Sequence, residues 1–111
     1  MQIEELHNYT LLFDIYGKLL SKKQYEVMDK YLNLDLGESE LAELFGESRQ
    51  SVYDAIVKAK KQLLHLEEMC NIVKNRLKSK QLLIECKEMI NNNNIDKNSL
   101  LKKIEDVINN I

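Results

Sequence analysis

The stretch ELAELFGESRQSVYDAI, residues 40–56, carries the spacing of a helix-turn-helix. In such a unit the first helix needs a small residue where the second helix crosses it, and the turn needs a residue that adopts a positive φ. The second helix then needs an apolar side chain that points back into the crossing. Ala42, Gly46 and Val52 occupy these three positions, and Ile56 continues the inner face of the second helix by one turn. The same spacing occurs in tight corners of helical bundles, so these positions alone leave both interpretations open.

Polar side chains fill the first turns of the second helix. Ser48 is a suitable N-cap, so we expect this helix to begin at Arg49. Arg49 and Gln50 are side-chain types that read guanine and adenine edges in a major groove, and we expect them to read bases together with Tyr53. Ser48 and the lysines further along the helix would hold the phosphate backbone. The full set of nucleic-acid-binding residues expected here is Ser48, Arg49, Gln50, Ser51, Tyr53, Asp54, Lys58, Lys60 and Lys61.

The rest of the sequence predicts an all-α fold. The 111 residues include no proline and three glycines, so the turn residues that a many-stranded fold needs are scarce. Apolar side chains recur every three to four residues over 6–20, and a capping-box pattern of Ser21 with Gln24 starts a second helix. That helix should end near 33–37, before a short helix over 39–45. The inner faces should include Leu19 in the first helix, and Leu41, Ala42, Leu44 and Phe45 in the short one.

After Arg49 an unbroken heptad pattern predicts one long helix. It would extend to Leu77, about 29 residues or some 43 Å. The pattern fails at Lys80, so we expect a bend or break near 78–81. The apolar positions of the pattern, with Cys70 among them as a small buried side chain, are Val52, Ile56, Ala59, Leu63, Leu66, Cys70, Val73 and Leu77.

The heptad pattern has two interpretations. It could pack as core within one chain, or its distal part, 66–77 with 82–90, could pair with a second copy, and we expect a homodimer. One all-α domain should span 1–111, with a helix-turn-helix part over 1–62 and a C-terminal helical extension over 63–111 that would hold the dimer contact. The asparagines at 91–94 should form a turn before a last helix, capped near Asp96 or Asn98.

The formal net charge of −2 conceals two halves of opposite sign. Residues 1–55 carry 5 positive and 11 negative side chains, whereas residues 56–111 carry 11 positive and 7 negative ones. The second half is therefore suited to an anionic partner. A second basic patch is expected at Lys74, Arg76, Lys78 and Lys80.

Several classes of protein are excluded. No apolar run approaches the length of a membrane span, and the N-terminal residues lack the pattern of a signal peptide. Cys70 and Cys86 lack CxxC spacing and suit a reducing cytoplasm, where we expect the protein to act. His7 and His65 have no metal-ligand spacing with these thiols, and no phosphate loop or nucleophile elbow is present. We therefore expect no enzyme, no metal site, no cofactor and no small-molecule substrate.

Two separate motifs resemble one known family. The run LLFDIYGKLLSKKQ, residues 11–24, resembles the opening of the YlxM family of small bacterial helix-turn-helix proteins. Residues 48–56, SRQSVYDAI, are similar to that family's SRQAVYDNI signature. Both motifs stand in the expected order and spacing, and the resemblance extends along the whole chain. The matching positions are Ser48, Arg49, Gln50, Val52, Tyr53, Asp54 and Ile56.

The resemblance implies a helix-turn-helix like that of region 4 of bacterial sigma factors, followed by a long helix and C-terminal helices. It also implies a regulatory protein with a role in the signal recognition particle pathway, through the position of the family's genes beside that of the particle's protein. The chain departs from the family pattern at Glu38, usually apolar, and at Glu47, usually valine. Two functions follow: a DNA-binding regulator, or an interaction module that contacts the signal recognition particle's protein or RNA through the second basic patch.

Overall fold

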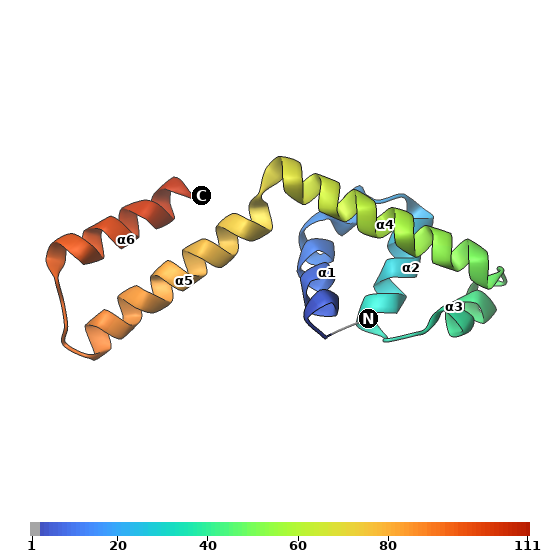
Figure 1. Cartoon of the computed structure of the whole chain (residues 1–111), viewed down its shortest axis with the longest axis horizontal. Coiled ribbons are helices and arrows are strands. Elements are labelled where there is room, and N and C mark those ends of the chain that lie inside the picture. The colour runs from blue at the N-terminus through green and yellow to red at the C-terminus, as the bar shows by residue number, and fades with distance from the viewer. Residues whose placement is uncertain (1–2) are drawn as a thin grey trace. The chain divides into compact units, whose positions relative to one another are not determined.

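The computed structural model describes residues 3–111 and is helical nearly throughout. No strand occurs in these residues, which confirms the all-α prediction. The chain forms two compact units, the first ending at Cys70 and the second spanning Asn71–Ile111. The elements are α1 (Ile3–Tyr16), the 3-10 turn η1 (Gly17–Leu19), α2 (Lys22–Asn33), α3 (Glu38–Phe45) and α4 (Arg49–Cys70) in the first unit, and α5 (Ile72–Asn91) and α6 (Lys97–Asn109) in the second (Figure 1).

In the first unit α4 packs against α1, α2 and α3 (Figure 1). The five buried side chains of α4 lie one, three or four residues apart and make one continuous stripe. Burial of each large aliphatic side chain contributes about 1.5–3 kcal/mol, so this stripe supplies much of the unit's stability. The buried residues of the unit are Leu12, Phe13, Tyr16, Gly17, Leu20, Val27, Met28, Leu32, Leu41, Ala42, Val52, Ala55, Ile56, Ala59 and Leu63.

The predicted caps and turn are present. Ser21 and Gln24 form a capping box at the start of α2, with the Gln24 backbone N–H donating to Ser21 Oγ at 3.2 Å. Gly46 follows α3 with φ of 64°, and its N–H donates to the Glu43 carbonyl at 3.3 Å. The Ser51 N–H donates to Ser48 Oγ at 3.0 Å, which makes Ser48 the cap of α4. The starts of α2 and α4 and the end of α3 are therefore each set by the capping or turn residue at that position.

The long helix ends earlier than the heptad pattern predicts. α4 stops at Cys70, Asn71 adopts a left-handed conformation with φ of 55°, and a separate helix follows. The predicted break at 78–81 is wrong, because these residues lie inside α5. The periodicity could not reveal the end of α4, because asparagine accepts a positive φ without disturbing the apolar spacing around it. Cys70, predicted to be buried, is exposed, because the fully buried stripe of α4 ends at Leu63.

Two further expected core positions are also wrong. Leu19 is 65% exposed because it lies in η1, whose three residues per turn shift it away from the face of α1. Leu44 is 55% exposed because the eight-residue α3 buries only a narrow stripe, at Leu41 and Ala42. In η1 the buried face is out of phase with that of α1, and in α3 the buried face is narrower than the apolar spacing predicts.

The second unit is a hairpin of α5 and α6 (Figure 1). The asparagine run forms the predicted turn, with Asn93 at a φ of 54°. Asp96 caps α6 by accepting from the Asn98 N–H at 3.3 Å. An ion pair between Lys103 and Glu85, 3.0 Å long, joins the two helices. Of the side chains in this unit only Cys86 is buried, so the hairpin leaves much apolar surface exposed.

None of the helices over residues 3–111 is long and apolar enough to cross a membrane.

Substitution of Gly46 tests the turn. A Cβ at this position meets no heavy atom within 4 Å, so its only cost is the left-handed backbone. We expect Gly46→Ala to lower the free energy of unfolding by about 1–2 kcal/mol. Gly46→Asn should lose less, because asparagine tolerates this conformation better. Denaturant titration followed by circular dichroism measures both, and equal stability of Gly46→Ala and wild type would contradict the assigned role.

Candidate nucleic-acid interface

The crossing of α3 and α4 has the geometry that the sequence predicts. Ala42 is 7% exposed and Val52 is fully buried, so the small residue and the apolar residue both lie inside the crossing. Ile56, one turn after Val52, is also buried. The Glu47 N–H donates to the Ala42 carbonyl at 2.9 Å, which closes the turn around Gly46. The unit therefore holds the N-terminal end of α4 in a defined orientation at the surface.

Side chains at this end of α4 are open to a partner. Ser48, Arg49, Gln50 and Asp54 are exposed, and the ring of Tyr53 is 47% exposed. We call Arg49, Gln50 and Tyr53 the reading end. A hollow of about 430 Å³ is lined by these three residues together with Glu38 of α3. The reading end thus shares its hollow with a carboxylate.

Gln50 and Asp54 interact along the helix. Gln50 Nε2 donates to Asp54 Oδ1 at 2.9 Å. One amide N–H of Gln50 is used in this bond, which leaves the other N–H and the amide oxygen. These two groups are what a glutamine uses to pair with an adenine edge. Asp54 therefore orients the Gln50 amide.

Glu47 is held by two partners. Its Oε2 lies 2.9 Å from Lys23 Nζ of α2, and it accepts a hydrogen bond from Ser51 Oγ at 3.1 Å. Lys23 also donates to Ser51 Oγ at 3.1 Å. The hydrogen bond from Lys23 lowers the pKa of Glu47 below its ordinary value, with a smaller contribution from Ser51 and some opposition from desolvation. The Glu47 carboxylate is thus paired, and Ser51, which contacts both partners, is half-buried.

Lys60 occupies a different face from the other lysines of α4. Its Nζ lies 5.0 Å from the ring centroid of Tyr9 and 5.5 Å from that of Tyr31. Burial raises the pKa of Tyr9 and that of Tyr31. Nearby carboxylates raise both pKa values further, and for Tyr9 that carboxylate is Glu5. Lys60 is half-buried there as a cation between two aromatic faces. Because residues advance about 100° along a helix, it points some 160° away from Lys58.

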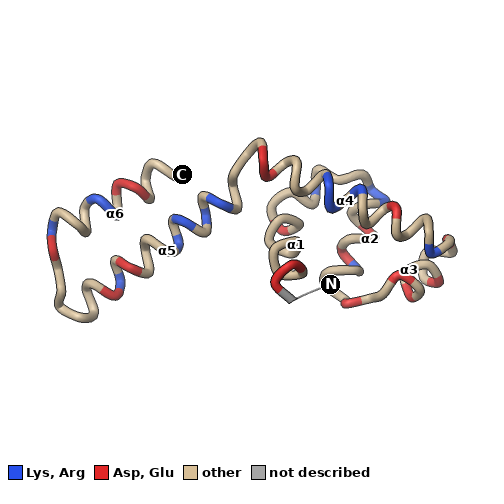
Figure 2. The backbone as a smooth tube through the Cα atoms, in the orientation of Figure 1, with Lys and Arg blue, Asp and Glu red and all other residues tan. Residues whose placement is uncertain are grey.

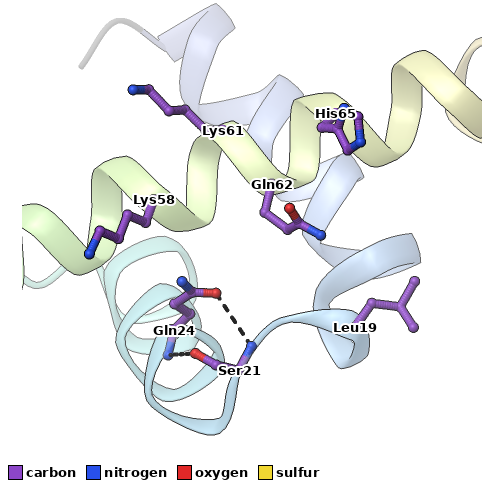
Figure 3. A pocket seen from close by; sticks show the side chains of 7 residues that line it. All are labelled: Leu19, Ser21, Gln24, Lys58, Lys61, Gln62 and His65. Carbon is purple, nitrogen blue, oxygen red and sulfur yellow. Dashed lines mark hydrogen bonds between the residues drawn. The ribbon is translucent and has the colours of Figure 1, made fainter.

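A groove opens between α4 and the segment that joins η1 to α2 (Figure 3). Its volume is about 530 Å³. Lys58, Lys61 and His65 reach it from α4, where their spacing of three and four residues puts them on one face. None of the described residues that line it is acidic. Its lining consists of Leu19, Ser21, Gln24, Lys58, Lys61, Gln62 and His65.

Four polar residues of this groove were not among the expected interface residues: Ser21, Gln24, Gln62 and His65. The positions of His65 and Gln62 could have been inferred from the sequence, since both lie within one turn of Lys61 on the same helix. For Ser21 and Gln24 the sequence indicated only a helix cap, and nothing in it placed them in an interface. Tertiary packing alone brings them beside α4.

The second basic patch lies on α5, in the other unit. All four of its side chains are exposed, and Figure 2 shows them as a blue stretch of that helix. Helical geometry pairs Arg76 with Lys80 on one side and Lys74 with Lys78 on another. The four cations therefore surround α5 instead of forming one face. Over residues 3–111 no group of three or more potential metal-ligating side chains comes together.

Comparison with known proteins agrees with this geometry. Residues 3–107 match the family described as "Putative helix-turn-helix protein, YlxM / p13 like". The chain belongs to this family. It is 35% identical to a UPF0122 protein of Acetivibrio thermocellus over 96% of this chain and 95% of the relative. It is 39% identical to one from Clostridium novyi, over 98% and 96% respectively. A probable UPF0122 protein of Mycoplasma mycoides is 38% identical, over 96% and 90%.

The family and the all-α fold are those of a helix-turn-helix protein. The resemblance drawn from the motifs at 11–24 and 48–56 is thereby confirmed. Both motifs have structural roles in the first unit. The first spans the end of α1, η1 and the capped start of α2, and the second spans the cap and first two turns of α4.

The Lys23–Glu47 pair should make stability depend on pH. The pKa of Glu47 is lowered on folding, so its contribution is present above the ordinary value of 4.5 and lost as the pH falls through the lower folded value. We expect Glu47→Gln to lower Tm at about pH 7 and to match wild type at about pH 3. Lys23→Met, which removes the other partner, should show the same convergence. A Tm difference that persists at low pH would contradict the assignment to this pair.

Proposed function

We propose that the chain is a cytoplasmic regulatory protein that binds DNA through the N-terminal end of α4. The observation that carries the proposal is the exposure of Arg49 and Gln50 on a helix whose start is capped and whose crossing is buried. Such an end fits a major groove, where arginine pairs with guanine and glutamine with adenine. Tyr53, one turn further on, would contact a base or a sugar beside them.

The hydrogen bond between Gln50 and Asp54 supports this role. A glutamine that reads adenine must hold its amide in one orientation, and Asp54 accepts one of its two N–H groups. Asp54 would act as a positioning residue, and its charge is partly compensated by that bond. A carboxylate on the outer face of a reading helix is otherwise unfavourable near phosphates.

The charge around the reading end limits the affinity of this contact. Residues 35–61 carry four positive and six negative side chains, and Figure 2 shows the acidic residues of α3 beside the start of α4. Glu38 lines the same hollow as Arg49. Because phosphate contacts supply most non-specific affinity, we expect the reading end by itself to bind weakly.

Replacement of Arg49 tests the reading end. Gel-shift titration against random genomic fragments at low salt should first yield a retarded species and a preferred sequence. Arg49→Ala should then lose about 1–3 kcal/mol of preference for that sequence, because one bidentate contact to guanine is removed. Affinity for unrelated fragments should change little. Failure of wild-type protein to retard any fragment at micromolar concentration would reject DNA binding.

A second candidate function is contact with the RNA or protein of the signal recognition particle. Acidic surroundings at the reading end and exposed cations on α5 favour it. The double variant Arg76→Glu and Lys78→Glu serves as the matched control for Arg49→Ala. It should keep DNA binding under the first proposal. Under the second, it should abolish capture of the particle's RNA or protein while Arg49→Ala leaves that capture intact.

We further propose that the second unit pairs with a second copy of the chain. Leu83 and Ile90 of α5 are each 52% exposed, and Leu101, Ile104 and Ile108 of α6 are 46, 39 and 60% exposed. Helical phase puts Leu83 and Ile90 on one face of α5, and Leu101, Ile104 and Ile108 on one face of α6. A hairpin with one buried side chain is marginal alone, and two such faces together form a four-helix bundle. The pair would also present two reading ends.

Light scattering tests this pairing. Wild-type protein should have twice the monomer mass of 13.0 kDa at micromolar concentration. The double variant Ile104→Glu and Ile108→Glu should have the monomer mass, because it buries charge in the contact. Leu19→Glu, which changes an exposed leucine of the first unit, should remain a dimer. A wild-type mass of 13.0 kDa would overturn the pairing.

A further inference from the structure

The groove between α4 and the start of α2 has the composition of an anion site. Lys58, Lys61 and His65 line one wall from α4, and Ser21 and Gln24 line the other (Figure 3). In Figure 3 the Lys58 side chain lies on the side of α4 nearer Gln24, whereas the Lys61 ammonium extends away from Ser21 and Gln24, and none of the described residues of the lining is acidic. Two cations and several hydrogen-bonding groups around one open hollow suit a phosphate group.

The backbone at the start of α2 adds to this field. The positive end of the α2 dipole lies where the chain leaves Ser21, on the groove wall opposite Lys58 (Figure 3). Ser21 and Gln24 satisfy each other in the capping box, with Gln24 Oε1 accepting from the Ser21 N–H at 3.3 Å. The cap fixes both side chains in the wall, so the groove is formed before any ligand arrives.

The groove is continuous with the reading side of α4. A second hollow, of about 280 Å³, contains Ser51 and Asp54 at one end and shares Ser21, Gln24 and Lys58 with the groove. Its path follows α4 from the first turns toward the middle of the helix. Its link to the reading end is Asp54, which accepts a hydrogen bond from Gln50 Nε2 at 2.9 Å.

The distance along α4 matches the dimensions of DNA. Lys58 and Lys61 follow Gln50 by eight and eleven residues, about 12 and 16.5 Å along the helix axis at 1.5 Å per residue, and at 100° per residue Lys61 lies within about 20° of Gln50 around the helix. A major groove is about 12 Å wide. When Gln50 contacts a base edge, Lys61 therefore lies on the same face at the strand that borders the major groove, and Lys58 lies within a quarter turn of that face.

We propose that this groove binds the phosphodiester backbone of the bordering DNA strand. The inference rests on the proposed DNA binding and deepens it, by assigning backbone contact to Lys58, Lys61 and His65 and not to Lys60. Lys60 stands between Tyr9 and Tyr31 and stabilises the fold. The groove also explains how a reading end in acidic surroundings gains affinity, because the attraction comes from the middle of α4.

Charge reversal tests the assignment. Fluorescence anisotropy with a random-sequence duplex, titrated over a range of salt, compares wild type with the double variant Lys58→Glu and Lys61→Glu. The control is Lys97→Glu with Lys102→Glu, two exposed lysines of α6 with the same change in net charge. The groove variant should lose at least tenfold in affinity, and its slope of log K against log salt should fall by about 2. The control should stay within twofold of wild type, with circular dichroism confirming both folds.

The two histidines provide a second readout. On addition of the duplex to wild-type protein, the ring resonances of His65 should shift, whereas those of His7, exposed on α1, should not. Binding with an unmoved His65, or with equal losses in both charge variants, would overturn the groove assignment and leave DNA binding intact. Absence of any duplex binding would overturn both. A His65 shift with inorganic phosphate but not with duplex would assign the groove to a free phosphate instead.

Discussion

The buried crossing of α3 and α4 is the contact on which the arrangement of the first unit depends. Because Ala42 of α3 is small, α4 can pack close to α3, and Val52 of α4 fills the space between the two helices. Because Val52 begins the buried stripe that ends at Leu63, the same contact sets the rotation of α4 against α1 and α2. That rotation decides which side chains of α4 face outward. The positions of the reading end and of the groove therefore follow from how α4 packs on the rest of the first unit.

Electrostatics in this unit is organised by pairing more than by net charge. Glu47 opposes an anionic partner in the sequence, yet it is paired with Lys23 and Ser51. Lys60 favours such a partner in the sequence, yet it is held between two tyrosine rings. A count of charges near the reading end therefore overstates the repulsion from Glu47 and also the attraction from Lys60. What a partner meets is set by the cations that remain exposed, above all Lys58 and Lys61.

Much of the fold could be predicted from the sequence. The caps at Ser21 and Ser48, the left-handed Gly46 and the asparagine turn each depend on a few neighbouring residues, and all are present. The end of α4 could not be predicted, because the apolar spacing continues past Asn71 although the backbone of Asn71 is left-handed and not helical. Exposure of Cys70 has the same origin. Periodicity identifies a helix face but does not say where the core that it covers ends.

In the candidate site, too, local features could be predicted from the sequence and contacts between distant residues could not. The sequence by itself determined that Arg49 and Gln50 stand at the start of a capped helix, because capping and turn chemistry act over three or four residues. Only the tertiary structure decided that Lys60 turns inward and that Ser21 and Gln24 lie beside Lys58. These contacts join residues that are 29 or more positions apart. Such neighbours follow from which helices pack together, and packing depends on the whole buried stripe, not on any local pattern.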